Sequence, residues 1–232
     1  MPIQGIAFDL EGTVIDVEAL HHTAHLEAAA HVGVLLTWQE ALERLPHFIG
    51  GTDEEVAAEI ASLAKGDVSA QAILHDKQRI FETLLQKDAD ISPREGFHDF
   101  LQWVENYGLR TAIGTVTRST QAKYLLQRSG LLEYFGSDRI VVREDVSSPK
   151  PHPDVYLETA QIMHILPQNQ LVFEDSVIGL QSALTAGCRL AAVPTVHQPG
   201  FVESLYQMGA EEVFKSWTDA DLKPFILRSI EI

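Results

Sequence analysis

Residues 5–16 read Gly5-Ile6-Ala7-Phe8-Asp9-Leu10-Glu11-Gly12-Thr13-Val14-Ile15-Asp16 and carry the clearest structural signal in the chain. An apolar run leads into two acidic residues, and a glycine and a threonine follow, as in a buried strand that ends in a tight turn. In an open parallel sheet, ligands bind at the carboxyl ends of the strands. Because side chains alternate along a strand, we expect Asp9 and Glu11 on one side and Leu10 on the other. The alternative interpretation is an N-terminal strand followed by a solvent-exposed acidic turn.

The composition excludes several classes of function. The chain has 232 residues, of which 45% are hydrophobic, and its formal net charge is −16. Nucleic-acid affinity comes mainly from Lys and Arg that neutralise phosphates, so this charge argues against a nucleic-acid partner. No apolar run approaches the roughly 20 residues that cross a bilayer, and we predict a cytoplasmic protein without a membrane partner. The single cysteine, Cys188, is expected to be a small buried hydrophobic residue.

The sequence pattern is helical from residue 17 to about residue 93. The first helix is predicted over residues 17–33. Two capping boxes, in which a Thr hydroxyl and a Glu carboxylate satisfy backbone N–H groups, mark helix starts at Thr37 and Thr52. A longer amphipathic run covers residues 68–87. We therefore predict four helices with no strand between them.

Strands return after residue 93 and alternate with helices. The predicted helices cover residues 97–107, 119–129, 153–164 and 176–186, and the predicted strands cover residues 109–114, 139–142, 170–173 and 189–193. Repeated alternation indicates a parallel sheet covered by helices on both faces. The predicted fold class is therefore α/β, with a Rossmann-like parallel sheet domain of residues 1–15 and 94–232. An inserted four-helix domain of residues 16–93 follows the first strand.

Two further polar stretches lie near the predicted strand ends. Residues 114–118 read Gly-Thr-Val-Thr-Arg before a helix, where hydroxyls and backbone N–H groups favour an anion, although such residues also serve simply as helix caps. Residues 148–153 read Ser-Pro-Lys-Pro-His-Pro, in which three prolines restrict the direction of Lys150. The alternative for Lys150 is a solvated side chain in a rigid loop.

A third stretch, residues 171–179, is an apolar strand that ends in Glu174 and Asp175 before a helix. Gly179, Ala183 and Gly187 recur every four residues, so we expect that helix to approach the sheet closely. The alternative interpretation is that the two acids only cap this helix, since acidic side chains are favourable in a first helical turn. Two acidic pairs at the ends of two buried strands repel each other, however, and a hard cation such as Mg²⁺ would resolve that repulsion.

These stretches resemble the four sequence motifs of the haloacid dehalogenase superfamily of phosphohydrolases. They are Asp9-Leu10-Glu11-Gly12-Thr13, Thr115, Lys150 with Pro151-His152-Pro153-Asp154, and Glu174-Asp175-Ser176 with Gly179. Their order and spacing match the branch with a helical cap inserted after the first strand, which includes β-phosphoglucomutase, phosphoglycolate phosphatase and sugar phosphatases. The match covers nearly the whole chain.

The resemblance implies roles for individual residues. Asp9 would attack phosphorus and form an aspartyl phosphate, and Lys150 would pair with the charge on Asp9 and on the phosphate. Thr115 and the neighbouring Val116 and Thr117 would hold the transferring phosphoryl group. The implied Mg²⁺ ligands are Asp9, Glu174, Asp175 and the backbone carbonyl of Glu11.

Glu11 departs from the usual pattern of the branch. The family normally has aspartate two residues after the nucleophile, as general acid for the leaving oxygen and then as base for water. Glutamate keeps that chemistry and adds one methylene, and enolase-phosphatases of the superfamily carry a similar Asp-x-Glu-Gly-Thr stretch. Haloacid dehalogenases and phosphonatases lack an acid there, so Glu11 favours phosphoryl transfer to water or to a sugar.

Residues of the predicted insert are candidates for substrate binding. His21 falls near the hinge, where the mutase has a histidine that senses a closed cap; the alternative is a solvated helix histidine. Residues 49–53, which include Gly51 and Thr52, resemble the cap loop that enters the site.

That loop also bears on the choice between phosphatase and mutase. In β-phosphoglucomutase it carries an arginine for the second phosphate, and here Asp53 stands in its place. Lys77 or Arg79 would be a replacement cation, with solvated side chains as the alternative. We therefore expect a Mg²⁺-dependent phosphatase acting on a small phosphorylated metabolite, such as a sugar or polyol phosphate, as a monomer or homodimer. The alternatives are a phosphosugar mutase and a weakly active relative that binds a phosphorylated metabolite.

Overall fold

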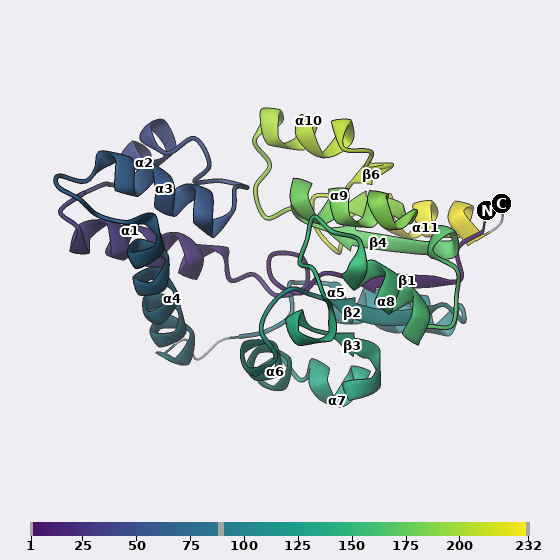
Figure 1. Cartoon of the computed structure of the whole chain (residues 1–232). Helices are drawn as coiled ribbons and strands as arrows, with labels where there is room; N and C mark the ends of the chain where they lie inside the picture. Colours follow the sequence, from purple (N-terminus) through teal and green to yellow (C-terminus); the bar gives the residue numbers. More distant parts are fainter. Residues whose placement is uncertain (1, 88–90, 231–232) are drawn as a thin grey trace. The chain divides into compact units, whose positions relative to one another are not determined.

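The computed structural model describes residues 2–87 and 91–230 of the chain (Figure 1). The chain divides into two compact units, Met1–Asp16 with Ile91–Ile232, and Val17–Asp90. We call the first the sheet unit and the second the helical unit.

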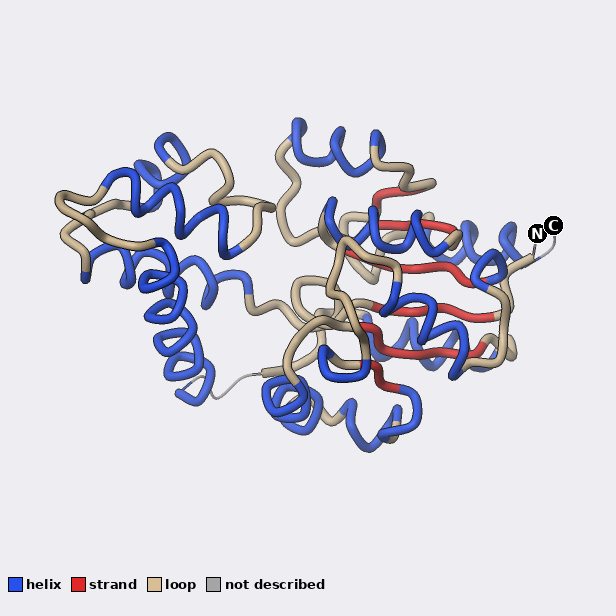
Figure 2. The backbone as a smooth tube through the Cα atoms, viewed as in Figure 1, coloured by secondary structure: helices blue, strands red, loops and turns tan. Residues whose placement is uncertain are grey.

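The sheet unit contains a six-stranded parallel sheet in the order β3-β2-β1-β4-β5-β6 (Figure 2). The strands are β1 (Gly5–Phe8), β2 (Arg110–Gly114), β3 (Ile140–Val141), β4 (Gln170–Glu174), β5 (Arg189–Ala192) and β6 (Glu212–Val213). Strand β1 lies between β2 and β4, and Phe8 is paired with Ile113 on one side and Phe173 on the other. Because parallel strands end at the same edge, the segments that follow β1, β2 and β4 are neighbours. The predicted α/β fold class is confirmed.

Helices connect the strands and cover the sheet. They are α5 (Phe97–Asn106), α6 (Ser119–Arg128), α7 (Leu131–Phe135), α8 (Asp154–Ile162), α9 (Val177–Ala186), α10 (Pro199–Gln207) and α11 (Leu222–Ile230), with short 3₁₀ turns at Ser137–Arg139, Arg143–Asp145 and Pro167–Asn169. Helix α8 packs against β1 and β2, and α9 packs against β4 and β5. Across the described residues of both units, we find no helix that combines the length and apolar character needed to span a membrane.

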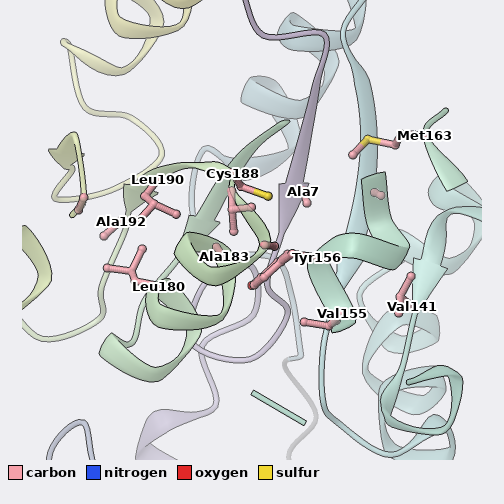
Figure 3. Close-up of a cluster of buried hydrophobic side chains, with 14 of the residues drawn as sticks. Ala7, Val141, Val155, Tyr156, Met163, Leu180, Ala183, Cys188, Leu190 and Ala192 are labelled. Atoms are coloured by element: carbon pink, nitrogen blue, oxygen red, sulfur yellow. The ribbon is translucent and has the colours of Figure 1, made fainter. Parts of the chain in front are cut away.

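Successive residues of β1 bury themselves on opposite faces of the sheet. Ala7 joins a cluster with Tyr156 and Leu180 of the helices α8 and α9 (Figure 3). Phe8 instead meets an aromatic group, with ring centroids 5.2 Å from Phe97 and 5.7 Å from Trp217. The small side chain on one face and the large one on the other fix β1 in the middle of the core, and so fix the position of the residue that follows it.

Helix α11, which follows Trp217, buries Phe225 and Ile226. One feature of the sheet unit differs from the sequence predictions. Gly187 was expected to lie on the sheet-facing side of its helix, and this prediction is wrong. It is exposed and ends α9 with a φ of 83°, a left-handed conformation that glycine adopts without steric cost.

The helical unit consists, within its described residues, of α1 (Glu18–His31), α2 (Trp38–Arg44), α3 (Asp53–Leu63) and α4 (Ala70–Lys87). Both predicted capping boxes are confirmed, because the hydroxyls of Thr37 and Thr52 accept hydrogen bonds from the N–H groups of Glu40 and Glu55. The apolar stripe of α4 is buried as expected, including Ile73 and Phe81.

A buried polar cluster ties three helices of this unit together. The Lys77 Nζ atom lies 2.5 Å from Asp53 Oδ2 and 2.7 Å from His21 Nδ1, and its side chain is only 1% exposed. His25 Nε2 lies 3.0 Å from Asp53 Oδ1. Burial lowers the pKa of His25. Burial also disfavours the charged form of Asp53, but the contacts with His25 and Lys77 outweigh it and hold the pKa of that carboxyl below its ordinary value. The solvated side chain considered for Lys77 is therefore not what the structure has.

We predict that Asp53→Ala destabilises the protein by about 3 kcal/mol, because it leaves the buried Lys77 ammonium without its carboxylate. This value is at the low end for a buried ion pair, since the Asp53 side chain is 34% exposed. Urea unfolding followed by circular dichroism measures the change. Glu82→Ala, at an exposed position of α4, is the matched control and should stay within about 0.5 kcal/mol of the wild type. Equal effects of the two substitutions would contradict the prediction.

Candidate active site

Asp9 lies at the centre of the site, directly after β1. Its N–H donates to the carbonyl of Phe173 at 3.0 Å, so the sheet pairing continues up to this residue. The Lys150 Nζ atom lies 2.5 Å from Asp9 Oδ1 and 2.5 Å from Glu174 Oε1. Asp9 is 7% exposed and Glu174 is 1% exposed. Residues from three separate segments thus meet at the carboxyl edge of the sheet.

The charged groups in this cluster shift one another's pKa values. Burial raises the pKa of Asp9 to about 7, although Lys150 opposes the shift. Burial also acts to raise the pKa of Glu174, but Lys150 and the Tyr156 hydroxyl outweigh it and the pKa falls below its ordinary value. Burial acts to lower the pKa of Lys150, but the two carboxylates raise it above its ordinary value. The lysine is therefore a fixed positive charge between two acids.

Glu174 is held by hydrogen bonds to both carboxylate oxygens. Oε1 accepts from Lys150 and, at 2.5 Å, from the hydroxyl of Tyr156 in helix α8. Oε2 accepts from the backbone N–H of Asp175 at 3.1 Å and from the hydroxyl of Ser176 at 3.1 Å. A Cβ atom on Gly179 would lie 1.9 Å from this carboxylate, so only glycine fits there. The glycine of the fourth motif makes room for Glu174.

The turn after Glu11 approaches Asp175 equally closely. Gly12 has a φ of +83°, and a Cβ atom there would lie 2.1 Å from Asp175 Oδ2. The Thr13 hydroxyl donates to Asp175 Oδ1 at 3.3 Å. The Arg94 guanidinium fixes the same turn by donating to the carbonyl of Gly12 at 2.7 Å, and the Trp217 indole donates to the carbonyl of Thr13 at 3.0 Å.

The donor set fits a hard divalent cation. Carboxylate oxygens of Asp9, Glu174 and Asp175 lie within 4.8 Å of one another. Three carboxylates face one ammonium, that of Lys150, so the cluster carries an excess of negative charge. Oxygen ligands with such an excess are what Mg²⁺ and Ca²⁺ prefer in proteins.

Glu11, two residues after Asp9, extends toward the segment that follows β2. Its Oε1 atom accepts hydrogen bonds from the Thr117 hydroxyl at 2.5 Å and from Gln121 Nε2 at 2.8 Å. Thr115 is buried, and its hydroxyl donates to the Thr117 hydroxyl at 2.9 Å. Val116, next to them, is half-buried. The structure therefore brings the predicted residues of the first and second motifs together.

The remaining predicted residues belong to the helical unit. His21 and Lys77 form part of its buried polar cluster. Thr52 caps helix α3, and a Cβ atom on Gly51 would lie 2.4 Å from His47 Cβ, which explains the glycine. The roles of these four residues in substrate binding stay predictions.

The chain is similar to known proteins over most of its length. A family model described as haloacid dehalogenase-like hydrolase matches residues 6–193. The chain belongs to the haloacid dehalogenase-like hydrolases.

Individual members of the family resemble it in sequence and in structure. Fructose-1-phosphate phosphatase YqaB of Escherichia coli is 30% identical over 185 residues, which are 79% of this chain and 92% of that protein. A hydrolase of the family from Deinococcus radiodurans, solved with bound phosphate and sodium, has a TM-score of 0.76 at 26% identity and covers 98% of this chain and 96% of its own. CbbY from Rhodobacter sphaeroides, in complex with xylulose-1,5-bisphosphate, has a TM-score of 0.68 at 27% identity and covers 93% of this chain and 95% of its own.

Three residues of this hydrolase that contact the predicted site residues or the first motif carry little signal in the sequence. Tyr156 leaves a weak signal, because a tyrosine in a buried helix face needs a partner for its hydroxyl. Arg94 lies in a polar connection, and Gln121 lies in an ordinary amphipathic helix, so neither carries a local signal.

We predict that Lys150→Met destabilises this hydrolase by about 3–5 kcal/mol in the presence of a chelator. The substitution leaves Asp9 and Glu174 as neighbouring buried carboxylates without their shared counter-charge. Denaturant unfolding measures the loss. Lys123→Met, at an exposed position of helix α6, is the control, and a Lys150 variant as stable as this control would refute the prediction.

Proposed function

We propose that this chain is a Mg²⁺-dependent phosphatase that hydrolyses a small phosphomonoester through an aspartyl phosphate. It is a phosphatase of the haloacid dehalogenase type. The observation that carries the proposal is the position of Asp9, a buried carboxylate at the carboxyl end of the central strand and 2.5 Å from the Lys150 ammonium. That arrangement suits a nucleophile that attacks a phosphate with its charge already offset.

In the first step, a carboxylate oxygen of Asp9 attacks phosphorus and a new P–O bond forms. The bond between phosphorus and the leaving alcohol oxygen breaks, and that oxygen takes a proton from the Glu11 carboxyl group. Lys150 offsets the negative charge of Asp9 and of the phosphoryl group, while Thr115 and the neighbouring backbone N–H groups orient the phosphoryl oxygens. The products of this step are a free alcohol and the aspartyl phosphate.

In the second step, the Glu11 carboxylate takes a proton from water, and the water oxygen attacks phosphorus. The bond to Asp9 breaks, which releases inorganic phosphate and restores both carboxyl groups to their starting states. Mg²⁺ bound by Asp9, Asp175, Glu174 and the Glu11 carbonyl would supply positive charge that offsets the phosphoryl oxygens.

A sugar or polyol phosphate is the proposed substrate. YqaB acts on fructose 1-phosphate by its name, and CbbY binds xylulose-1,5-bisphosphate, so related proteins handle phosphorylated sugars. The helical unit is proposed to act as the cap that selects the substrate and excludes water from the reaction. We extend the proposal to a cytoplasmic monomer or homodimer.

The mutase alternative requires a cation for a second phosphate. In the described part of the helical unit, Lys77 is buried and paired with Asp53, and Arg79 is exposed and paired with Asp76 at 2.6 Å. A lysine that already serves a carboxylate is a poor anchor for a phosphate. Of the two cations considered for a second phosphate, the buried one is thus already paired, which supports a monophosphate substrate and hydrolysis.

The proposal predicts that the purified protein releases phosphate from small alkyl phosphomonoesters, and that Asp9→Asn lowers this rate by at least about 10³-fold, since the amide is a poor nucleophile. A phosphate-release assay over a panel of sugar and polyol phosphates, including fructose 1-phosphate, measures both. Asp99→Asn, at an exposed position of α5, controls for the loss of one charge. Activity of the Asp9 variant within tenfold of wild type would eliminate Asp9 as the nucleophile.

Removal of divalent metal should abolish phosphate release, and added Mg²⁺ should restore it. Binding also stabilises the folded state, so saturating Mg²⁺ should raise the melting temperature of the wild type. Asp175→Asn removes one charged ligand and should reduce this rise, which differential scanning fluorimetry measures without any substrate. If EDTA changed neither activity nor melting temperature, the metal assignment would fail.

A further inference from the structure

The Glu11 carboxylate is held by two hydrogen-bond donors from the segment that follows the neighbouring strand, β2. Thr117 lies in the loop after β2 and Gln121 lies in the first turns of α6, and both donate to the same oxygen, Glu11 Oε1. The two donors are separated from Glu11 by 106 and 110 residues of sequence. This contact crosses from the nucleophile loop to the loop that follows β2.

The reach of the side chain matters for this contact. Aspartate at position 11 would be shorter by one methylene, about 1.5 Å. Withdrawal of the carboxylate by that length along the line of the contact would break the hydrogen bond to the Gln121 Nε2 atom, which is 2.8 Å from Glu11 Oε1. The amide of Gln121 and the hydroxyl of Thr117 therefore match glutamate and not the shorter acid.

We propose that Gln121 is a positioning residue that, together with Thr117, aims the Glu11 carboxyl group at the leaving oxygen. This inference rests on the proposed phosphatase function. The Thr117 hydroxyl also accepts from the Thr115 hydroxyl at 2.9 Å, so one hydrogen-bonded chain links Thr115, Thr117 and Glu11. The Thr117 hydroxyl is therefore itself held in place by Thr115, and Gln121 supplies the second anchor for Glu11 Oε1. A displacement of about 1 Å at such a group can cost about a hundredfold in rate.

Two substrates with different leaving groups test this role, because loss of a purely structural residue would slow both of them equally. An alkyl phosphomonoester such as fructose 1-phosphate needs a proton for its departing oxygen, whereas p-nitrophenyl phosphate releases a stable phenolate without one. The ratio kcat/KM reports the steps up to leaving-group departure. Gln121→Leu keeps the volume of the side chain and removes its N–H donor.

We expect Gln121→Leu to lower kcat/KM for the alkyl ester by about 10- to 100-fold and for p-nitrophenyl phosphate by less than about threefold. Gln127→Leu, an exposed glutamine on the same helix, should change neither. Glu11→Asp should lower kcat/KM for the alkyl ester on its own, and Gln121→Leu should add less than about twofold in that background, because the shorter acid no longer reaches the amide.

The outcomes separate this inference from the proposed function. Equal losses on both esters, or losses from Gln121→Leu and Glu11→Asp that multiply, would overturn the positioning role and leave the phosphatase in place. A wild-type chain that hydrolyses neither ester would overturn the proposed function, and this inference with it. Thermal melting of each variant shows whether a loss of activity comes from unfolding, and a Gln121→Leu protein that melts well below wild type would assign Gln121 a structural role instead.

Discussion

Buried carboxylates at the ends of neighbouring strands require a positive charge among them, and the geometry of this site follows from that requirement. Asp9 and Glu174 each lie 2.5 Å from the Lys150 ammonium. Without it, two acids that are almost completely buried would repel each other and lose their hydration. The lysine neutralises only part of the charge, because Asp175 adds a third carboxylate. The same electrostatic excess therefore makes the site suitable for a cation and, through that cation, for a phosphate.

The order of the strands explains how distant residues reach this lysine. Strand β1 lies between β2 and β4, so the ends of these three strands are adjacent. Each end contributes one set of polar residues to the site, and the loop before α8 contributes Lys150. The aromatic group around Phe8 and the small residue Ala7 hold β1 in register from both faces. A rigid hydrophobic core thus places the polar atoms that chemistry requires.

The sequence predicted the parts of this arrangement that depend on local pattern. Apolar strands that end in acids identified Asp9 and Asp175, because strand ends are readable from residue order alone. Gln121 and Arg94 were not predictable, since Glu11 lies 110 residues from Gln121 and Gly12 lies 82 residues from Arg94, and nothing in their own segments marks them. Gly187 illustrates the opposite error, because a regular spacing of small residues indicated packing where the helix in fact ends. The burial of Lys77 also depends on a distant partner, because a charged residue is expected to be solvent-exposed until its buried partner is known.

The two segments of the sheet unit that flank the helical unit in the sequence are held together. Within the sheet unit, the Arg94 N–H donates to the carbonyl of Val14 at 2.7 Å, so the outgoing and returning segments are hydrogen-bonded to each other. Domains whose two ends lie together are the ones that proteins accept as insertions, because the host fold does not have to stretch around them. Selection can therefore replace or lengthen the four-helix insert without shifting β1 or its acids. On the proposed role of the helical unit as a cap, exchange of this one contiguous segment would change the substrate while the hydrolytic residues stay in place.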